Sequence, residues 1–310
     1  MGELRVEESG EGVLLATIEN PPHALMDDDI VAGLDALAER AETDDSVTAV
    51  VLTGAHPDRF VAHYDVGELL DGAQQAPAVA PAVARASLGA VGALRRLPGG
   101  SEALDRSPAA ALSAAERFGE IFLRFNTSGA VFVAAINGSA MGGGCELALA
   151  CDTRLMAEGP FQIGQPEILL GFPPGGGGTQ RLARLLGSGP ALRLCLEGNG
   201  LPPLAAAELG VIDEVVAPER LTDRALELAT RFAGRPKAAI AGVKRAVYLG
   251  GAQALPAGLR LERAEFMSAL VTEPAKQAMA AYLERFEATG ELPAYDEQAF
   301  AEALERGRFG

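Results

Sequence analysis

A run of glycines between two apolar segments constrains the fold of this chain most strongly. The apolar run Val131 to Ile136 predicts a strand, and the apolar run Cys145 to Cys151 predicts a buried helix. The glycines of Met141-Gly142-Gly143-Gly144 between them let a ligand approach the backbone closely. Because the first N–H groups of a helix have no partner within it, and the helix dipole is positive there, this junction predicts a site for negative charge. A glycine turn needed only for close packing is the alternative.

The glycine run fits neither of two familiar nucleotide motifs. It lacks the Lys-[Ser/Thr] pair of a P-loop and the G-x-G-x-x-G spacing of a dinucleotide fold. Neither kind of nucleotide site is therefore assigned to this chain.

Strands and helices alternate over the first two thirds of the sequence. Residues 13–18 and 47–52 predict strands, and apolar residues recur at helical spacing between them, from Ile30 to Ala41. Two later segments, 154–157 and 211–216, also predict strands. This order is typical of an α/β protein.

The C-terminal third has a different character. Apolar residues at helical spacing predict helices over 221–232, 240–247, 259–271 and 274–287. We therefore divide the chain into a core, residues 1–217, and a helical segment, residues 218–310. An Ala/Pro/Gly-rich insertion at about 72–111 interrupts the core, and such a long loop is either a poorly ordered surface segment or a lid whose arginines meet an anionic ligand.

Composition excludes several classes of function. The 310 residues are 48% hydrophobic and carry a formal charge of −16, which argues for a globular protein and against a nucleic-acid partner. The sequence has no apolar run of about 18 residues, so it predicts no membrane span. The acidic N-terminus lacks the apolar region of a signal peptide, and we expect a cytoplasmic protein.

The spacing of the cysteines predicts no disulfide, and the spacing of the histidines predicts no metal site. Three cysteines without a C-x-x-C pair are expected to be reduced core thiols. No two of the three histidines lie two to five residues apart, so we expect no metal.

Two acidic side chains stand in apolar surroundings. Glu146 lies in the first turn of the predicted buried helix, and Glu167 follows 21 residues later in Gln165-Pro166-Glu167-Ile168. Burial and mutual repulsion push the pKa values of two such carboxylates apart, which lets one act as acid and the other as base.

The chain resembles the crotonase superfamily, and within it the enoyl-CoA hydratases, in four segments. They are 135–148, Cys151-Asp152, Gly164-Gln165-Pro166-Glu167 and 176–182. The similarity extends from about residue 13 to 216 and, more weakly, to about 286. The insertion and the last twenty or so residues do not align. The resemblance implies a crotonase (ClpP-like) ββα spiral core of α/β class, followed by an all-helical segment that builds homotrimers, often paired into hexamers.

The resemblance also implies an activity. The enzyme would be a lyase, an enoyl-CoA hydratase that adds water syn to a trans-2-enoyl-CoA through an enolate. The backbone N–H groups of Tyr64 and Gly143 would bind the thioester oxygen. Glu146 and Glu167 would hold and activate the water, with the N–H of Gly175 helping to hold it. No cofactor is implied beyond the coenzyme A of the acyl-CoA substrate.

The first oxyanion loop, Phe60-Val61-Ala62-His63-Tyr64-Asp65, departs from the family pattern because histidine stands where glycine is usual. Either His63 is tolerated without a chemical role, or it alters substrate choice or shapes the CoA groove. Two prolines before Gly175 replace the usual one. Lys276 and the arginines of the insertion are candidates to contact the CoA phosphates. The residues that the resemblance places along the substrate and CoA are Ala62, His63, Asp65, Gly142 and His23.

Three other functions remain open at this point. The shared oxyanion hole also permits a double-bond isomerase or a β-oxo thioester hydrolase. These two activities are the first alternative function. The second alternative is a non-catalytic acyl-CoA-binding homologue, and the third is a structural or partner-binding α/β protein. The presence of both glutamates favours the hydratase.

Overall fold

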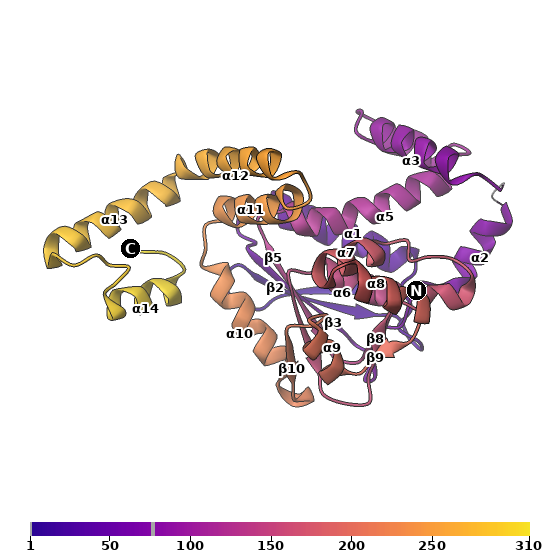
Figure 1. Cartoon of the computed structure of the whole chain (residues 1–310), viewed down its shortest axis with the longest axis horizontal. Helices are drawn as coiled ribbons and strands as arrows, with labels where there is room; N and C mark the ends of the chain where they lie inside the picture. Colours follow the sequence, from indigo (N-terminus) through magenta and orange to yellow (C-terminus); the bar gives the residue numbers. More distant parts are fainter. Residues whose placement is uncertain (1, 76–77) are drawn as a thin grey trace.

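The chain folds around two β-sheets covered by helices, and the computed structural model describes residues 2–75 and 78–310 (Figure 1). The larger sheet has six strands in the order β1-β2-β3-β5-β7-β10. Only β1 and β2 pair antiparallel, and the other neighbours pair parallel. Its strands are β1 (Glu3–Glu8), β2 (Val13–Glu19), β3 (Ala49–Gly54), β5 (Val131–Ile136), β7 (Thr153–Ala157) and β10 (Glu214–Val216).

The smaller sheet has four short strands in the order β4-β6-β8-β9. Each of three successive turns of the chain sends one strand to the larger sheet and the next to the smaller one, namely β3 then β4, β5 then β6, and β7 then β8. A helix follows each pair, which confirms the expected ββα spiral. The strands are β4 (Arg59–Val61), β6 (Ser139–Met141), β8 (Ile163–Gly164) and β9 (Gly200–Leu201).

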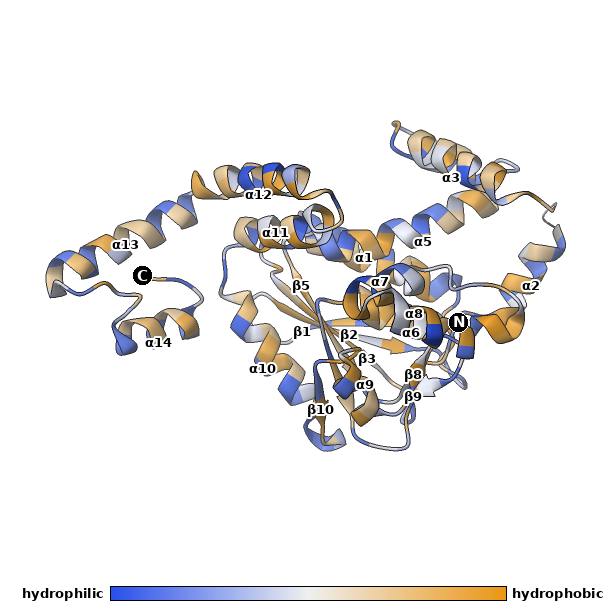
Figure 2. Ribbon diagram, viewed as in Figure 1, coloured by the Kyte–Doolittle hydropathy of each residue, from blue (hydrophilic) through white to orange (hydrophobic). Residues whose placement is uncertain are grey.

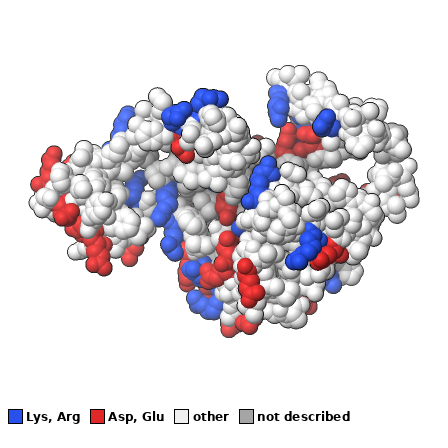
Figure 3. Space-filling model, in the orientation of Figure 1, with Lys and Arg blue, Asp and Glu red and all other residues white. Residues whose placement is uncertain are grey.

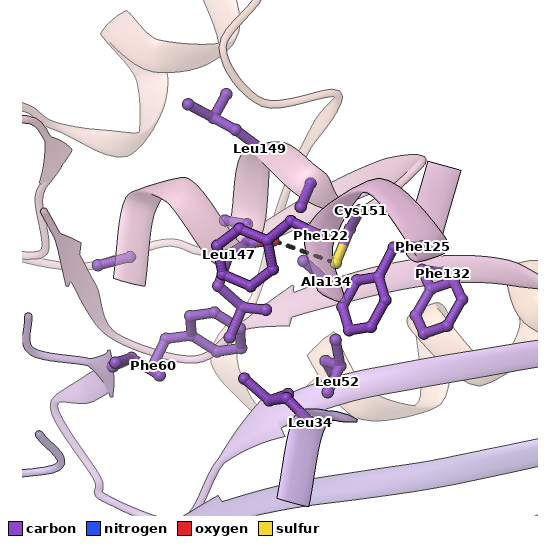
Figure 4. Packing of buried hydrophobic residues seen from close by; sticks show 14 of the residues in the cluster. Leu34, Leu52, Phe60, Phe122, Phe125, Phe132, Ala134, Leu147, Leu149 and Cys151 are labelled. Atoms are coloured by element: carbon purple, nitrogen blue, oxygen red, sulfur yellow. Dashed lines mark hydrogen bonds between the residues drawn. The ribbon is translucent and has the colours of Figure 1, made fainter. Parts of the chain in front are cut away.

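Helices cover both faces of the larger sheet. The inner strands β2, β3, β5 and β7 are largely apolar without alternation, because neighbouring residues enter different cores, as expected for strands buried on both faces. On one face, Leu52 and Phe132 join Leu34 of α1 and Phe122 and Phe125 of α5 (Figure 4). The helices up to the end of the core are α1 (Asp28–Thr43), α2 (Val66–Gln75), α3 (Pro81–Arg95), α4 (Gly100–Asp105), α5 (Ala110–Thr127), α6 (Gly143–Ala150), α7 (Gly178–Leu186), α8 (Ser188–Glu197) and α9 (Pro203–Leu209), with a 3₁₀ turn η1 (Glu167–Leu170).

The described elements after β10 are all helical, as the sequence predicts, with α14 as an addition that no pattern indicated. α10 packs its residues Leu221, Ala225 and Ala229 on the second face of the larger sheet. α11 packs on α5 of the core, whereas α12 and α13 extend away from it (Figure 1). We propose that the boundary between the core and the C-terminal helical segment lies near residue 217. The helices are α10 (Leu221–Ala233), α11 (Lys237–Arg245), α12 (Leu255–Leu270), α13 (Glu273–Thr289) and α14 (Glu297–Arg306), with short turns η2 (Pro218–Arg220) and η3 (Ala246–Gly250).

The insertion at 72–111 is not the long loop that its prolines and glycines predict. Apart from residues 76–77, which lie outside the described part of the chain, it contains the end of α2, all of α3 and α4 and the start of α5. Alanine, the strongest helix former, explains the outcome. α3 and α4 pack on the N-terminal part of α5 and project from the core as an arm, which we call the helical arm (Figure 1).

The surface of the helical arm is mostly uncharged on the face that Figure 3 shows. It exposes several apolar side chains, among them Val83, Leu94 and Leu97. Most of the other helices carry both apolar and polar residues (Figure 2). None of the helices in the described ranges combines the length and the hydropathy that a membrane span requires.

Candidate active site

Glu146 lies in the first turn of α6 and is only 3% exposed. Its Oε1 accepts hydrogen bonds from the backbone N–H groups of Gly176, at 2.7 Å, and of Gly178, at 2.9 Å. The glycine segment at the start of α7 therefore orients this carboxylate.

Those positions require glycine because the backbone lies against side chains. A Cβ at Gly176 would stand 2.5 Å from Glu146 Oε2 and 2.5 Å from the ring of Phe118. A Cβ at Gly178 would stand 2.5 Å from the Gln165 amide. Any larger residue would push the loop away from the carboxylate that it holds.

Glu167 begins the 3₁₀ turn η1 and is 8% exposed. With its amide oriented as its partners require, Gln165 donates to both carboxylate oxygens of Glu167, at 2.9 and 3.1 Å. Burial raises the pKa of Glu167, and a hydrogen bond from its own backbone N–H opposes that rise. Gln165 thus orients the carboxylate of Glu167, which is the second oriented carboxylate of the site.

The two glutamates share an electrostatic environment. Burial raises the pKa of Glu146 to about 7, and the negative charge of Glu167 raises it further, against the hydrogen bonds from Gly178 and Gly176. A carboxyl group whose pKa is near neutrality can both accept and release a proton at physiological pH. Glu146 therefore has the property expected of a general acid or base, and burial also raises the pKa of Glu167.

Two unused backbone donors meet close to this pair. A Cβ at Gly143 would lie 3.3 Å from the backbone nitrogen of Tyr64, so the two main chains are in contact. In the described part of the chain, neither the Tyr64 N–H nor the Gly143 N–H donates to another residue. Gly142, directly before Gly143, has a φ of +52°, a conformation that favours glycine. Two free N–H groups at a helix N-terminus are an arrangement that binds a developing oxyanion.

The donors and the carboxylates belong to one site. A Cβ at Gly142 would lie 3.2 Å from Glu167 Oε1 and 3.5 Å from His63 Cβ. The β6–α6 junction therefore separates Glu167 from the first oxyanion loop by a single glycine.

The first oxyanion loop is anchored along its length. Ala62 N–H donates to Ala24 O, and Met26 N–H donates to His63 O. Asp65 Oδ1 accepts from Gly67 N–H at 2.7 Å and so caps the start of α2. The cap is the role that the structure gives Asp65.

The Tyr64 side chain points away from these donors. Its hydroxyl donates to Asp28 Oδ1 at 3.0 Å, and its ring meets the Phe118 ring edge to face at 5.8 Å. Tyr64 therefore contributes its backbone to the site while its side chain fixes the loop to α1 and α5.

The structure does not gather all the residues predicted from the sequence. Gly175 is exposed, and the N–H groups that contact Glu146 belong to Gly176 and Gly178, so the water-holding role of Gly175 stays a prediction. His23 is exposed, and its carbonyl accepts from Arg59. The predicted residues that do meet are Glu146, Glu167, Tyr64, His63, Gly142 and Gly143.

Several residues of the site were not predicted. Gln165 and Gly176 lie inside the motifs quoted above, so their place in the motif was the available signal. Arg181 also lies in such a motif. Its guanidinium donates to Asn126 Oδ1 at 2.6 Å, its Nε has no partner among the described residues, and its charge lowers the pKa of Glu146. No sequence pattern indicated Phe118, because it lies on α5, outside the motifs quoted above.

All three cysteines are free thiols: Cys145 and Cys151 are buried, whereas Cys195 is only half-buried. Burial raises the pKa of Cys145, and the charges of Glu146 and Glu167 raise it further. Within the described ranges, no three His, Cys, Asp or Glu residues are grouped so as to hold a metal ion.

Known proteins resemble the chain in sequence. The sequence profile of the family described as Enoyl-CoA hydratase/isomerase matches residues 101–290. A short-chain-enoyl-CoA hydratase of Clostridium acetobutylicum is 30% identical, over 89% of this chain and 93% of the relative. A probable enoyl-CoA hydratase of Rhizobium meliloti is 42% identical, over 49% of this chain and 58% of the relative, so that match spans little more than half of the relative.

Solved structures resemble it in fold. DspI of Pseudomonas aeruginosa superposes with a TM-score of 0.73 at 31% identity, covering 91% of this chain and 94% of that one. An enoyl-CoA hydratase of Bacillus anthracis gives a TM-score of 0.73 at 25% identity, covering 91% and 96%. The family profile, the relative matched over nearly its whole length and the shared fold agree: the chain belongs to the enoyl-CoA hydratase/isomerase family and is an enzyme of the crotonase superfamily.

Proposed function

We propose that this enzyme is an enoyl-CoA hydratase that adds water syn to a trans-2-enoyl-CoA. The observation that carries the proposal is the pair of buried carboxylates, Glu146 and Glu167, beside the free N–H groups of Tyr64 and Gly143. A single enolate-stabilising glutamate suffices to move a double bond, whereas activating water and protonating carbon is the work of two. The names of the relatives support the same activity.

The two backbone donors would act on the thioester. Attack at the β-carbon moves negative charge onto the thioester oxygen and gives an enolate. N–H groups fixed in place before the reaction stabilise that charge without reorganising, and loss of one such donor typically costs about 3 to 4 kcal/mol. Tyr64 and Gly143 are candidates because both N–H groups lack a partner among the described residues and their main chains are in contact.

The two glutamates would handle the water. One carboxylate removes a proton from the water as its oxygen bonds to the β-carbon. The same pair then delivers a proton to the α-carbon, so that H and OH add to the double bond. Glu146, with its pKa raised to about 7, is suited to exchange protons near neutral pH.

Substrate and assembly form part of the proposal. The partner would be an acyl-CoA thioester, and the assembly a homotrimer or hexamer, in which exposed apolar residues of the C-terminal segment such as Val243 and Val247 would be covered. Lys276, exposed on α13, remains a candidate to contact the CoA phosphates.

The direct test is incubation with crotonyl-CoA and with medium- and long-chain enoyl-CoAs while the absorbance of the conjugated double bond is followed. We expect loss of the absorbance. Glu146→Gln and Glu167→Gln should each lower kcat by roughly 10² to 10⁴ or more, since each removes an acid or base. Glu158→Gln, an exposed residue after β7, is the matched control and should retain full activity.

Each contrary result points to a different function. No loss of absorbance with any chain length would overturn the hydratase. Binding of acyl-CoA without turnover of any enoyl or β-oxo thioester would identify a non-catalytic homologue. Release of free CoA or a shifted double bond without hydration would identify the hydrolase or the isomerase.

A further inference from the structure

The side chain of His63 folds back onto the first oxyanion loop. Its Nδ1 lies 2.8 Å from the carbonyl oxygen of the next residue, Tyr64. A carbonyl oxygen can only accept, so Nδ1 carries the hydrogen and donates it. In the neutral ring, Nε2 is then the nitrogen without a hydrogen.

The backbone around Tyr64 shows which way that carbonyl points. Met26 pairs with Tyr64 as an isolated parallel bridge, in which Met26 N–H donates to His63 O and Asp65 N–H donates to Met26 O. In such a pairing Tyr64 lies between the two residues that bond to Met26, and its own N–H and C=O both point away from Met26. The Tyr64 carbonyl therefore shares an edge with the Tyr64 N–H, which faces Gly143.

This arrangement has an electrostatic consequence for the oxyanion site. A carbonyl oxygen left without a donor beside a developing oxyanion repels it. A hydrogen bond from a fixed donor withdraws charge from that oxygen and so weakens the repulsion. Glycine, the residue that is usual at this position, has no side chain to provide that donor.

We propose that His63 is a positioning residue of the oxyanion loop, whose Nδ1–H binds the Tyr64 carbonyl and so withdraws charge from an oxygen that lies on the same edge as the Tyr64 N–H and would otherwise repel the developing oxyanion. The inference rests on the proposed function, because it requires a thioester oxygen at that place. It assigns a role to the residue at which this chain departs from the family pattern. His63 itself does not touch the reacting atoms in this role.

The first measurement reads the oxyanion site without turnover. Butyryl-CoA labelled with ¹³C at the thioester carbonyl is a saturated thioester that cannot be hydrated, and its carbonyl stretching frequency falls when donors polarise it. Isotope-edited infrared spectra of the bound ligand should show a lowered frequency in the wild type and a smaller lowering in His63→Ala. Thermal melting of each variant checks that it folds.

The conservative variants separate the hydrogen bond from the bulk of the ring. In His63→Asn, the side-chain amide nitrogen takes the place of Nδ1 and should restore the lowered frequency. In His63→Gln, the amide nitrogen corresponds to Nε2 and should not. His56→Ala, in the loop between β3 and β4, is the control histidine and should match the wild type.

Kinetics with crotonyl-CoA give a second readout. A neutral hydrogen bond of typical strength predicts that His63→Ala lowers kcat by about 5- to 10-fold with little change in KM, and that His63→Asn recovers most of the loss. A role in binding CoA would instead raise KM and leave kcat unchanged, and would overturn the proposal.

The outcomes distinguish the two proposals. If the wild type polarises the carbonyl and His63→Ala does so equally, the role of His63 is overturned while the hydratase stands. If alanine, asparagine and glutamine variants fold and lose polarisation equally, the hydrogen bond is not the cause and the inference fails. If asparagine alone restores polarisation but no enoyl-CoA is hydrated, the inference stands and the hydratase fails. If the wild type does not polarise the bound thioester, both are overturned.

Discussion

The Oε1 atom of Glu146 lies 2.7 Å from the backbone nitrogen of Gly176, a residue 30 positions further along the chain. This hydrogen bond joins the first turn of α6 to the segment before α7, and Gly178 N–H adds a second bond to the same oxygen. The carboxylate and the glycine segment are therefore one unit, and a change in either one displaces the other.

Substituting Gly176 tests this unit. In Gly176→Ala the new Cβ would stand 2.5 Å from Glu146 Oε2 and from the Phe118 ring, so the loop and the carboxylate must separate. A displacement of this kind can lower kcat/KM by about 10²-fold. Gly189→Ala in α8 adds a methyl group where no other atom lies within 4 Å, and should leave activity unchanged. Equal activity of the two variants would show that Gly176 does not position Glu146.

The raised pKa of Glu146 predicts how stability depends on pH. Because burial lifts this pKa from 4.5 to about 7, the folded protein keeps a proton that the unfolded chain loses. Stability from this group is therefore fully present below pH 4.5 and is lost as the pH rises to about 7, by about 3 kcal/mol in all.

Glu146→Gln is neutral at every pH and escapes this loss. Denaturant unfolding of both proteins should give similar pH trends below pH 4.5, and the variant should gain about 3 kcal/mol relative to the wild type by pH 8. Glu158→Gln, exposed, should follow the wild type throughout. Parallel curves for Glu146→Gln and wild type would contradict the raised pKa.

A buried ion pair connects the C-terminal segment to the core. Lys244 of α11 lies 2.6 Å from Asp152, just after α6, and also donates to Ala130 O at 2.5 Å. Asp152 accepts the Tyr248 hydroxyl at 3.0 Å as well. The side chains of Lys244 and Asp152 are 7% and 12% exposed, so neither charge is well solvated.

Removing one partner of this pair should be costly. Lys244→Met leaves a buried carboxylate without its cation, which typically lowers the free energy of unfolding by about 3 to 5 kcal/mol. Arg220→Ala removes a cation from exposed pairs with Asp223 and Glu227 and should change it by about 1 kcal/mol or less. Denaturant unfolding measures both, and equal effects would contradict the buried pair. Adding Asp152→Asn to Lys244→Met should recover part of the loss.

Arg95 links the helical arm to α5 by polar contacts. Arg95, whose side chain is 10% exposed, joins α3 to α5 through Glu120 at 3.1 Å and Ser113 at 2.8 Å. Arg95→Ala should loosen the arm, and limited proteolysis should cut faster within 78–111 while the core stays intact. Arg96→Ala, exposed and adjacent, is the matched control. Equal cleavage of both variants would show that this contact does not hold the arm.

Local patterns in the sequence were sufficient for much of the fold. The strand predicted at 131–136 has the bounds that the structure shows, because an uninterrupted apolar run between polar ends is a local signal. The strand β1 was not predicted, since its sequence Glu-Leu-Arg-Val-Glu-Glu is half acidic and lies at the edge of the sheet. The insertion at 72–111 was wrongly predicted as a loop, because proline and glycine were weighted above the helix propensity of its alanines.

The sequence by itself determined which carboxylates and which glycine run make up the site. Glu146 and Glu167 were recognisable because acids in apolar segments are rare, and the glycines because they stand between a strand and a helix. The tertiary structure alone decided which N–H groups orient Glu146, that Gln165 holds Glu167, and that His63 binds the carbonyl of Tyr64. Some of these contacts join segments that are distant in the sequence, and the His63 contact depends on the direction of one peptide group. Neither the contacts nor that direction is set until α6, η1 and the first oxyanion loop pack together.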